Sequence, residues 1–372
     1  MGDERYFDTA ASCPPFPEAL RRFEEVSLRL YGNPSSTHAW GQGAHEELEA
    51  AREGILGRLG FPDGALIVTS GATEANNLVI RSVMDSRPEG RLLLAADVHD
   101  SAWFARALYP GRVDLLETGP DGRISAARLE SRLTRKTVLV SLLHVNNETG
   151  SIHDLGTLGA ACARKGVALH CDGVQAAGRL PLALGSLPFA AYTFSAHKFG
   201  GPRGVGGVIL RDVRLGPLLR GGGQEGGARS GTENVAGLSA AHVALELSAR
   251  ALDLEVPRLR LLARLLADSV PEALLNSDPE HGLPGLISLS FPNLVGESLV
   301  SELNLRGFAI SAGSACGSGK MEPSRPVMAM GRTREQALGT VRISMGRQTT
   351  EQAVRDLAAT LKEAAERQRA LA

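Results

Sequence analysis

The chain lacks several features that would place it in a common class of protein. Its four cysteines form no Cys-x-x-Cys pair, which in 372 residues argues against a disulfide scaffold or a zinc ribbon and favours a reducing compartment. Its 40 Lys and Arg residues balance 41 Asp and Glu residues, and no basic stripe marks a nucleic-acid-binding surface. No apolar run approaches the roughly 18–20 residues of a membrane span, and the start (MGDER) has no secretion signal. We therefore expect a cytoplasmic protein without a structural metal.

The composition suits a large globular protein. Of its residues, 43% are hydrophobic and 22% charged, which is ample for a buried core and favours two packed domains. Strands are expected at 65–70, 91–98, 137–145, 167–171, 190–195 and 205–210, with helices at 71–83 and 152–165. Apolar strands that alternate with helices predict an α/β fold, in which a mostly parallel sheet is covered on both faces.

A second domain is expected beyond this sheet. Leu and Ala recur at helical spacing over 234–269, which predicts a long helix that bridges the two domains. Further strands at 285–291 and 340–345 and a last helix at 350–372, with Thr350 as its N-cap, complete the prediction. We expect a large domain at 16–253 and a small domain formed by 1–15 and 254–372.

Polar clusters follow several expected strands, at the edge where open parallel sheets bind ligands. The first, 70–77 (SGATEANN), lies between a strand and a helix, so its amides suit a phosphate, although an ordinary helix cap has the same pattern. The second, 170–175 (HCDGVQ), places Asp172 at a strand end. An acid there is either a turn cap or the partner of a protonated ring nitrogen in a cofactor.

Lys198 lies in the third cluster, 195–202 (SAHKFGGP), 26 residues after Asp172. A lysine that forms a Schiff base must reach the cofactor and have a lowered pKa, whereas most lysines are simply solvated. A strand and its connection are enough to bring Lys198 and Asp172 into one pocket. That juxtaposition favours a cofactor-binding lysine.

Cys316 stands in the fourth cluster, 311–319 (SAGSACGSG). A structural cysteine packs among apolar neighbours, but the neighbours here are Gly, Ser and Ala. We therefore favour a reactive thiol on a mobile, exposed loop over a structural cysteine. Cys162, on a helix face, and Cys171, on a buried strand, are interpreted as structural, and Cys13 is given no role.

Taken in order, these clusters resemble the cysteine desulfurases of the NifS/IscS-like branch, within the class V aminotransferase-like, fold-type I pyridoxal phosphate enzymes. The resemblance spans nearly the whole chain. It also includes the stretches 6–8 (YFD), 31–36 (YGNPSS), 144–150 (HVNNETG), 229–232 (RSGT) and 341–344 (VRIS). It implies a large domain with a mostly parallel seven-stranded sheet and a smaller α+β C-terminal domain that carries the Cys316 loop.

The resemblance also implies roles for individual residues. Lys198 would bind pyridoxal 5′-phosphate covalently, Asp172 would pair with its ring nitrogen, and His99 would stack on the ring and assist proton transfer. The remaining residues are Gln175 and Asn147 at the phenolic oxygen, Ala72, Thr73, Ser195 and His197 at the phosphate, Thr232 at the phosphate of the neighbouring subunit, and Arg342 at the substrate carboxylate with Asn33 beside it. Thr232 thereby implies a homodimer.

The implied activity is removal of sulfur from L-cysteine, which leaves L-alanine and a persulfide on Cys316. The sulfur would pass to an acceptor protein, either an iron–sulfur scaffold or a tRNA-thiolation enzyme, with no direct nucleic-acid or membrane partner. The alternatives are another class V enzyme, such as a selenocysteine lyase or an aminotransferase, and a non-enzymatic scaffold. The need for Cys316 separates the selenocysteine lyase, and an assay for alanine and sulfide with cysteine decides for or against the scaffold.

Three places depart from the family pattern. Val98 and Asp100 flank His99, where Glu and Lys are usual, the run 9–15 (TAASCPP) differs, and the chain ends soon after its last helix. These departures put the identity of the sulfur acceptor in doubt more than the chemistry. His144 and His170 lie on apolar strands and are interpreted as hydrogen-bonded core residues.

Overall fold

The large sheet holds the first half of the chain together. A computed structural model describes residues 3–211, 213–313 and 322–371. Within them, seven strands form one sheet in the order β1-β7-β6-β5-β4-β2-β3. The strands are β1 (Ala65–Thr69), β2 (Arg91–Ala95), β3 (Val113–Leu116), β4 (Thr137–Leu143), β5 (Ala168–Asp172), β6 (Ala191–Ser195) and β7 (Gly206–Leu210). Only β7 runs against its neighbours, so the predicted, mostly parallel seven-stranded sheet is confirmed.

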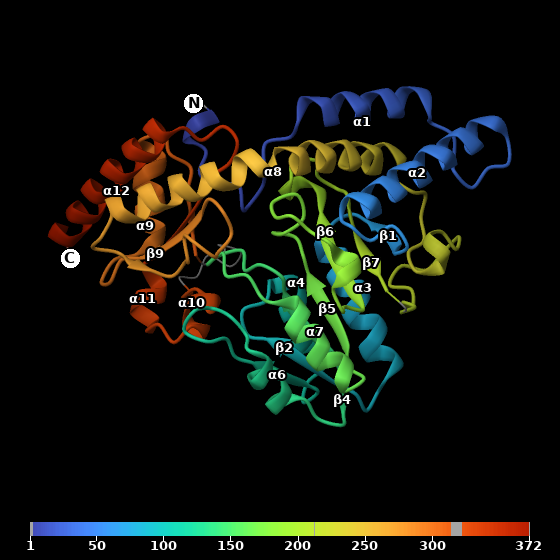
Figure 1. The fold of residues 1–372 in the computed structure, drawn as a ribbon, viewed down its shortest axis with the longest axis horizontal. Coiled ribbons are helices and arrows are strands. Elements are labelled where there is room, and N and C mark those ends of the chain that lie inside the picture. Colours follow the sequence, from blue (N-terminus) through green and yellow to red (C-terminus); the bar gives the residue numbers. More distant parts are fainter. Residues whose placement is uncertain (1–2, 212, 314–321, 372) are drawn as a thin grey trace.

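Helices cover both faces of this sheet (Figure 1). They are α3 (Ala72–Ser86), α4 (Asp100–Trp103), α5 (Ala105–Leu108), α6 (Ala126–Arg132) and α7 (Leu155–Arg164), with α1 (Pro17–Arg29) and α2 (Ala39–Arg58) packed on α8 (Val235–Ser269). The predicted helix at 152–165 begins three residues late, because the Asp154 side chain accepts the Thr157 amide and caps α7. Short 3-10 turns are η1 (Asp3–Arg5), η2 (Leu184–Ser186), η3 (Ala196–Lys198) and η4 (Glu225–Gly227).

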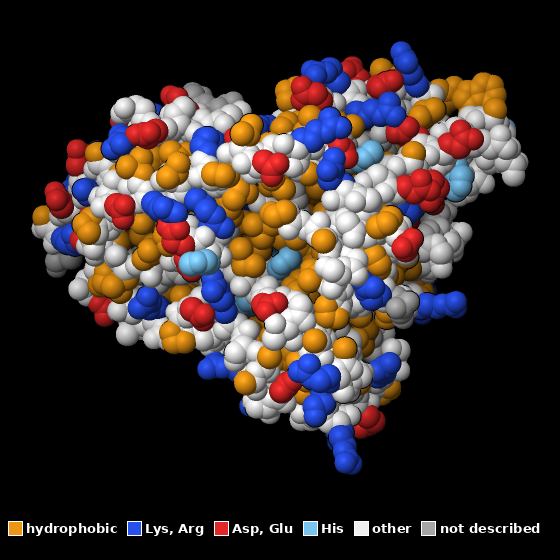
Figure 2. Space-filling model, viewed as in Figure 1, with side chains coloured by type: hydrophobic (Ala, Val, Ile, Leu, Met, Phe, Trp, Pro, Cys, Tyr) orange, Lys and Arg blue, Asp and Glu red, His pale blue; other side chains and the backbone are white. Residues whose placement is uncertain are grey.

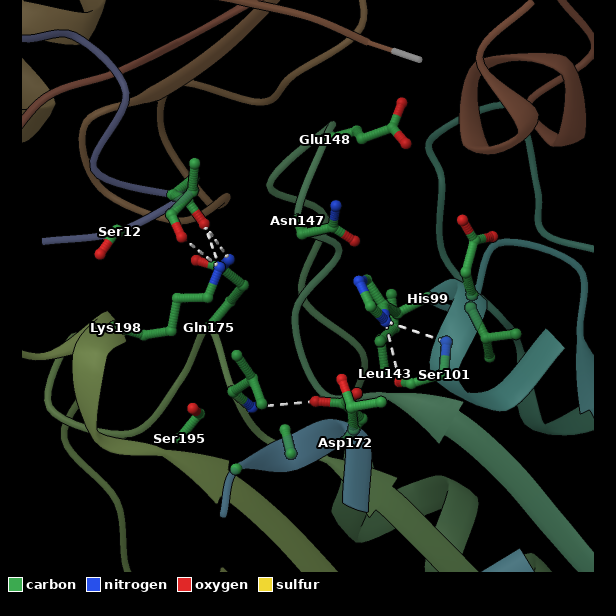
Figure 3. Close-up of a pocket in the computed structure, with 18 of the residues that line it drawn as sticks. Ser12, His99, Ser101, Leu143, Asn147, Glu148, Asp172, Gln175, Ser195 and Lys198 are labelled. Atoms are coloured by element: carbon green, nitrogen blue, oxygen red, sulfur yellow. Dashed lines mark hydrogen bonds between the residues drawn. The ribbon is translucent and has the colours of Figure 1, made fainter. Parts of the chain in front are cut away.

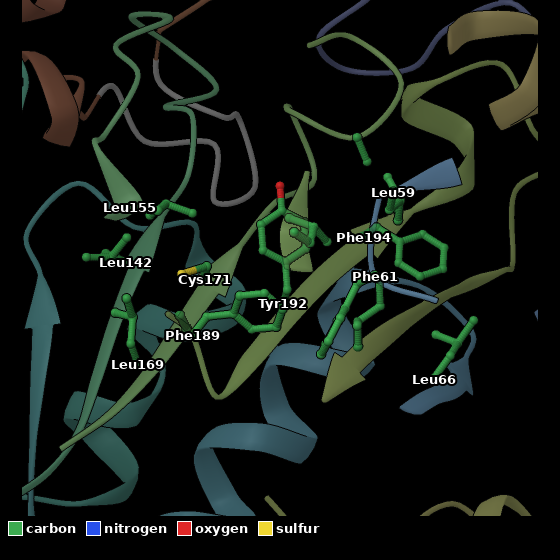
Figure 4. Close-up of a cluster of buried hydrophobic side chains, with 14 of the residues drawn as sticks. Leu59, Phe61, Leu66, Leu142, Leu155, Leu169, Cys171, Phe189, Tyr192 and Phe194 are labelled. Carbon is green, nitrogen blue, oxygen red and sulfur yellow. The ribbon is translucent and has the colours of Figure 1, made fainter. Parts of the chain in front are cut away.

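The core of the large sheet is aromatic and aliphatic (Figure 4). Tyr192 and Phe194 on β6 are fully buried, and Phe189 lies against Tyr192 with ring centroids 5.7 Å apart. Every residue of β6 is buried, as a strand covered on both faces requires. This packing fixes the carboxyl ends of the strands, where the polar clusters begin.

A second, antiparallel sheet lies in the C-terminal part, in the order β10-β11-β9-β8. Its strands are β8 (Leu274–Leu275), β9 (Leu286–Ser290), β10 (Ser311–Ala312) and β11 (Thr340–Ser344), with helices α9 (Gly296–Leu305), α10 (Arg325–Ala329), α11 (Arg334–Leu338) and α12 (Glu351–Leu371). Phe7 packs into the core of this region, and its backbone bonds Ala309 and Ser344. The Thr350 hydroxyl accepts the Ala353 amide, which confirms the predicted N-cap.

Helix α8 runs continuously past both sheets and contains Pro257. The predicted boundary near residue 253 falls inside it, and that division stays a prediction. No helix of the described ranges combines the length and the apolarity that a bilayer span needs. Acidic and basic side chains are interspersed over the face shown in Figure 2.

Candidate active site

A cavity of about 720 Å³ lies at the carboxyl edge of the large sheet, bounded on its other side by β10 and β11 of the second sheet. Its volume is in the range of small-molecule and cofactor pockets, roughly 300–1,000 Å³. Ten predicted site residues line it: Ala72, Thr73, His99, Asn147, Asp172, Gln175, Ser195, His197, Lys198 and Arg342. Residues far apart in the sequence therefore meet in one place, as the positions of the clusters after the strands predicted.

Lys198 follows β6 directly, in the turn η3. Its Nζ donates to the carbonyl oxygens of Ala10 at 2.6 Å and Ala11 at 2.9 Å (Figure 3). Burial, reinforced by the charges of Arg342 and Arg179, lowers the pKa of Lys198 to about 8. Near neutral pH a larger fraction of this amine is unprotonated than for an ordinary lysine, as a nucleophile requires.

Asp172, the last residue of β5, presents a buried carboxylate to the cavity. Its Oδ2 accepts from Asn76 Nδ2 at 2.7 Å, and its Oδ1 accepts from the Val174 amide at 3.1 Å. Asn76 also donates to Ser101 Oγ at 2.8 Å. The sequence reasoning gave Asn76 no role, although its place four residues after Ala72 puts it one turn further along α3, on the same side of the helix. These bonds hold the carboxylate in one orientation.

One end of the cavity has the features of an anion-binding site. Helix α3 begins at Ala72, and its N-cap, Gly71, has φ 152° and no capping side chain, so the first amides of the helix have no side-chain acceptor there. A Cβ at Gly71 would lie 3.6 Å from Ser195 Oγ, and a Cβ at Gly206 would lie only 2.8 Å from Gly71 Cα. Glycine at 206 thus lets this turn approach β7 closely.

His197 closes the same end. Its Nδ1 lies 3.2 Å from Ser12 Oγ. Burial, followed by the charges of Lys198 and Arg203, lowers the pKa of His197 to about 4. The imidazole is therefore neutral at neutral pH and offers an N–H donor rather than a charge.

His99 caps the short helix α4. Its Nδ1 accepts the Ser101 amide at 3.1 Å and lies 2.8 Å from Ser101 Oγ. Because Nδ1 accepts, the neutral ring carries its proton on Nε2. Val98 and Asp100, which flank His99 and depart from the family pattern, both contact Arg325. Arg325 donates to Val98 O at 2.6 Å and pairs with Asp100 at 3.0 Å.

Arg342, on β11, reaches the cavity from the second sheet. Its Nη2 pairs with Asp8 Oδ1 at 2.8 Å, and its Nη1 donates to Asn147 O at 3.0 Å. The Nε is buried and has no partner among the described residues. A planar cation held in this way suits a carboxylate ligand.

Two predicted residues do not line the cavity of their own chain, and a third lies outside the described residues. Cys316 lies outside the described residues, although Gly313 and Glu322, on either side of that gap, both line the cavity. Asn33, expected beside Arg342, lies in the connection between α1 and α2, where its Oδ1 accepts the Ser35 amide, and does not line the cavity of its own chain. Thr232 is exposed shortly before α8 and does not reach the cavity of its own chain.

Glu148 is a cavity residue that sequence reasoning passed over, although it lies within the 144–150 motif. Its Oε2 accepts from Ser324 Oγ at 2.6 Å. Burial raises the pKa of Glu148 to about 7, against the opposing effects of Ser324, Arg342 and Arg325. The signal available was an acid directly after Asn147, at the end of a strand.

The interpretation of the remaining histidines and cysteines as structural agrees with their surroundings. His144 Nδ1 lies 2.8 Å from the Tyr192 hydroxyl. His170 contacts Ser141 Oγ at 2.9 Å and Thr193 Oγ1 at 3.1 Å. Cys162 and Cys171 are free and buried.

The geometry fits pyridoxal 5′-phosphate. An amine with a lowered pKa, a buried carboxylate and an anion-binding helix start occupy three sides of a cavity of suitable size. Those are the groups that would hold the cofactor's aldehyde carbon, ring nitrogen and phosphate.

Comparison with known proteins leads to the same class. Residues 5–357 match the family described as Aminotransferase class-V. A protein named cysteine desulfurase IscS from Enterobacter sp. (strain 638) is 34% identical over 364 residues, covering 94% of this chain and 89% of that protein. A solved structure titled NIFS-LIKE PROTEIN has a TM-score of 0.89 at 30% identity and covers 97% of this chain and 98% of that one. Another, titled "SspA in complex with cysteine", has a TM-score of 0.79 at 27% identity, covering 93% and 100%. The chain therefore belongs to the class-V aminotransferase family, in its cysteine desulfurase branch, and the expected fold-type I architecture is confirmed.

Proposed function

We propose that this chain is a pyridoxal-phosphate-dependent cysteine desulfurase that converts L-cysteine into L-alanine and leaves the sulfur as a persulfide on Cys316. The observation that carries the proposal is the meeting of Lys198, Asp172 and Arg342 in one cavity. The relatives named above support the reaction.

The residues of the chain divide the work by position. Arg342 binds the carboxylate of the substrate and so orients its Cα toward Lys198. The Lys198 amine, once free, moves the Cα proton, and His99 Nε2 exchanges a proton with the substrate. Bound pyridoxal phosphate supplies the electron sink, and Asp172 keeps its ring nitrogen protonated.

The phosphate and the phenolic oxygen have their own donors. The α3 amides at Ala72 and Thr73, the Ser195 hydroxyl and the His197 imidazole hold the phosphate, while Asn147 and Gln175 face the phenolic oxygen. Each of these residues lines the cavity. Their shared role is to fix the ring so that Lys198 and the substrate meet the same carbon.

The sulfur-transfer step needs a second nucleophile. The Cys316 thiolate attacks the substrate sulfur, so that the substrate C–S bond breaks, an S–S bond forms and the former substrate carbon takes a proton. Gly313 and Glu322, which flank the segment bearing Cys316, both line the cavity, which supports delivery of the thiol there. The persulfide then passes its sulfur to an acceptor, either an iron–sulfur scaffold or a tRNA-thiolation enzyme.

The proposed unit is a homodimer. Thr232 lies outside the cavity of its own chain, and so does Asn33. Leu28, Tyr31 and Trp40 leave exposed apolar side chains beside Asn33. A second copy would cover this surface and bring Thr232 to the neighbouring phosphate.

Two variants test the proposal in the purified full-length chain. Lys198→Ala is expected to lose the yellow absorbance of the lysine-bound cofactor. Cys316→Ser is expected to keep that absorbance and its change on adding cysteine, but to form no persulfide and release no alanine. Cys162→Ala, which removes a buried thiol on α7, is the matched control and should retain the absorbance, its change on adding cysteine, persulfide formation and alanine release.

Each outcome has one meaning. A parent protein that takes up no pyridoxal phosphate would refute the cofactor assignment. Alanine release from Cys316→Ser at the parental rate would instead indicate lyase chemistry of the selenocysteine lyase kind. Loss of persulfide in Cys162→Ala as well would mean that the assigned thiol is wrong.

A further inference from the structure

Arg179 is a charged group beside the cavity to which the proposed reaction assigns no role. It lies in the turns after β5, and its Nη1 donates to the Gln175 side-chain oxygen. Within the described ranges, no carboxylate lies within ion-pair distance of its guanidinium. Burial, with the nearby Arg342 charge, lowers the pKa of Arg179, yet a guanidinium stays protonated at physiological pH. An uncompensated positive charge therefore stands behind Gln175.

The bond from Arg179 decides which way the Gln175 amide faces. Because Oε1 accepts from Arg179, the amide nitrogen Nε2 must point the other way. Nε2 donates to the Ala10 carbonyl oxygen at 2.8 Å, and Lys198 Nζ donates to the same oxygen at 2.6 Å (Figure 3). The guanidinium, the amide and the amine thus form a continuous chain of contacts.

We propose that Arg179 is a positioning residue that fixes the Gln175 amide with its N–H toward Ala10 O, the oxygen that also accepts from Lys198, and supplies a positive charge that favours the unprotonated form of the Lys198 amine. The inference rests on the proposed function for its consequence, since the neutral amine is the form that captures the cofactor. A donor at Gln175 backed by a cation also favours the anionic form of the cofactor's phenolic oxygen.

The other groups that act on the charge of Lys198 do not cancel the effect of Arg179. Arg342 on β11 also disfavours its charge, while Asp172 on β5 and the thiol of Cys13 in the N-terminal segment favour it. Asp172 is already paired with Asn76 and the Val174 amide. Removing Arg179 therefore leaves Arg342 as the one cation in this set, and the ammonium form of Lys198 becomes easier to reach.

Competitive acetylation of the full-length, cofactor-free chain measures the effect directly. Acetic anhydride reacts with the neutral amine, and mass spectrometry of the Lys198 peptide from pH 6 to 10 gives the midpoint of its ionisation. The parent is expected near pH 8. Arg179→Met should raise the midpoint by about one unit, and Arg179→Lys, which keeps the charge, by no more than about 0.3 unit.

A matched control is Arg347→Met. Arg347 is also a partly buried arginine, but it donates to Pro14 O and Pro15 O, lies 3.9 Å from the Phe16 ring centroid and is not among the groups that shift Lys198. The midpoint of Lys198 ionisation in Arg347→Met should equal that of the parent. A second readout is the pH titration of the absorbance of the bound cofactor, whose midpoint should rise in Arg179→Met only.

Two results would overturn the inference: an unchanged midpoint in Arg179→Met, or an equal rise in Arg179→Met and Arg179→Lys. Because acetylation is measured without cofactor, these results are distinct from a failure of the proposed function. That failure would appear as a parent chain that binds no pyridoxal phosphate, whatever the Lys198 midpoint.

Discussion

Glu148 should make the folded protein less stable as the pH rises, and replacing it with glutamine should remove this contribution. Burial raises its pKa in the folded state from the ordinary 4.5 to about 7. An acid whose pKa is raised on folding resists ionisation in the native state, so its cost is absent below pH 4.5 and grows until the pH passes 7. The Glu148→Gln side chain cannot ionise, but its amide oxygen still accepts from Ser324 Oγ.

The size of the effect follows from the two pKa values. The cost of Glu148 is roughly 1 kcal/mol at pH 5.5 and roughly 3 kcal/mol at pH 8, from about 1.4 kcal/mol for each pKa unit. The free energy of unfolding of Glu148→Gln, relative to the parent, should therefore increase by about 2 kcal/mol between these two pH values. The groups that face Glu148 are Ser324, Arg342, Arg325 and Asp100, and none of them changes in the variant.

Urea unfolding of the cofactor-free chain at pH 5.5 and pH 8 measures this difference. Glu74→Gln is the matched control, since Glu74 accepts from Arg229 Nε at 2.8 Å and from the Ser70 amide at 2.8 Å, and these bonds lower its pKa despite burial. Its stabilisation is lost only as the pH falls through and below 4.5, so Glu74→Gln should be destabilised equally at both pH values. A Glu148→Gln difference that stays constant from pH 5.5 to 8 would refute the reasoning.

Two further substitutions probe the residue that holds Asp172 and the proposed anchor of the substrate carboxylate. Asn76→Ala removes the hydrogen bonds to Asp172 and Ser101 and should lower the free energy of unfolding by about 2–3 kcal/mol. Urea unfolding measures this difference. An unchanged free energy of unfolding would show that Asp172 is not held by Asn76. Arg342→Lys keeps the charge but loses the planar guanidinium that can donate two parallel hydrogen bonds to a carboxylate. It should raise the KM for cysteine about 10- to 100-fold with a smaller change in kcat. Initial rates of alanine release measure both constants, and an unchanged KM would show that Arg342 is not the carboxylate anchor.

The sequence predicted those parts of the site that follow directly from strand ends. Asp172 ends one buried strand and Lys198 follows shortly after another strand of the same sheet, and a parallel arrangement leaves their side chains at one edge. The start of α3 was also predictable, because a glycine between a buried strand and a helix marks a tight turn. The strands β4 to β6 are long enough and apolar enough to be recognised individually.

Other parts depend on contacts between distant segments, which no local pattern encodes. The short strands β3, β8 and β10 are formed by pairing with their neighbours, and β8 and β10 have only two residues each. Asn33 was expected beside Arg342 because both belong to motifs of the same family, yet the packing of α1 and α2 on α8 carries Asn33 away from the cavity of its own chain. A site completed by a second copy cannot be placed from one sequence.

The position of Arg342 shows why both sheets are needed for the proposed chemistry. Its guanidinium is held by Asp8 and by the Asn147 carbonyl, which come from distant parts of the sequence and from the regions of different sheets. Asn147 follows β4 of the large sheet, whereas Asp8 bridges to Ser344 at the end of β11. Lys198, Asp172 and the phosphate end come from the large sheet, whereas the proposed anchor of the substrate carboxylate comes from the second sheet. A shift of the second sheet would move Arg342 relative to Lys198 and would change substrate binding while leaving the cofactor contacts in place.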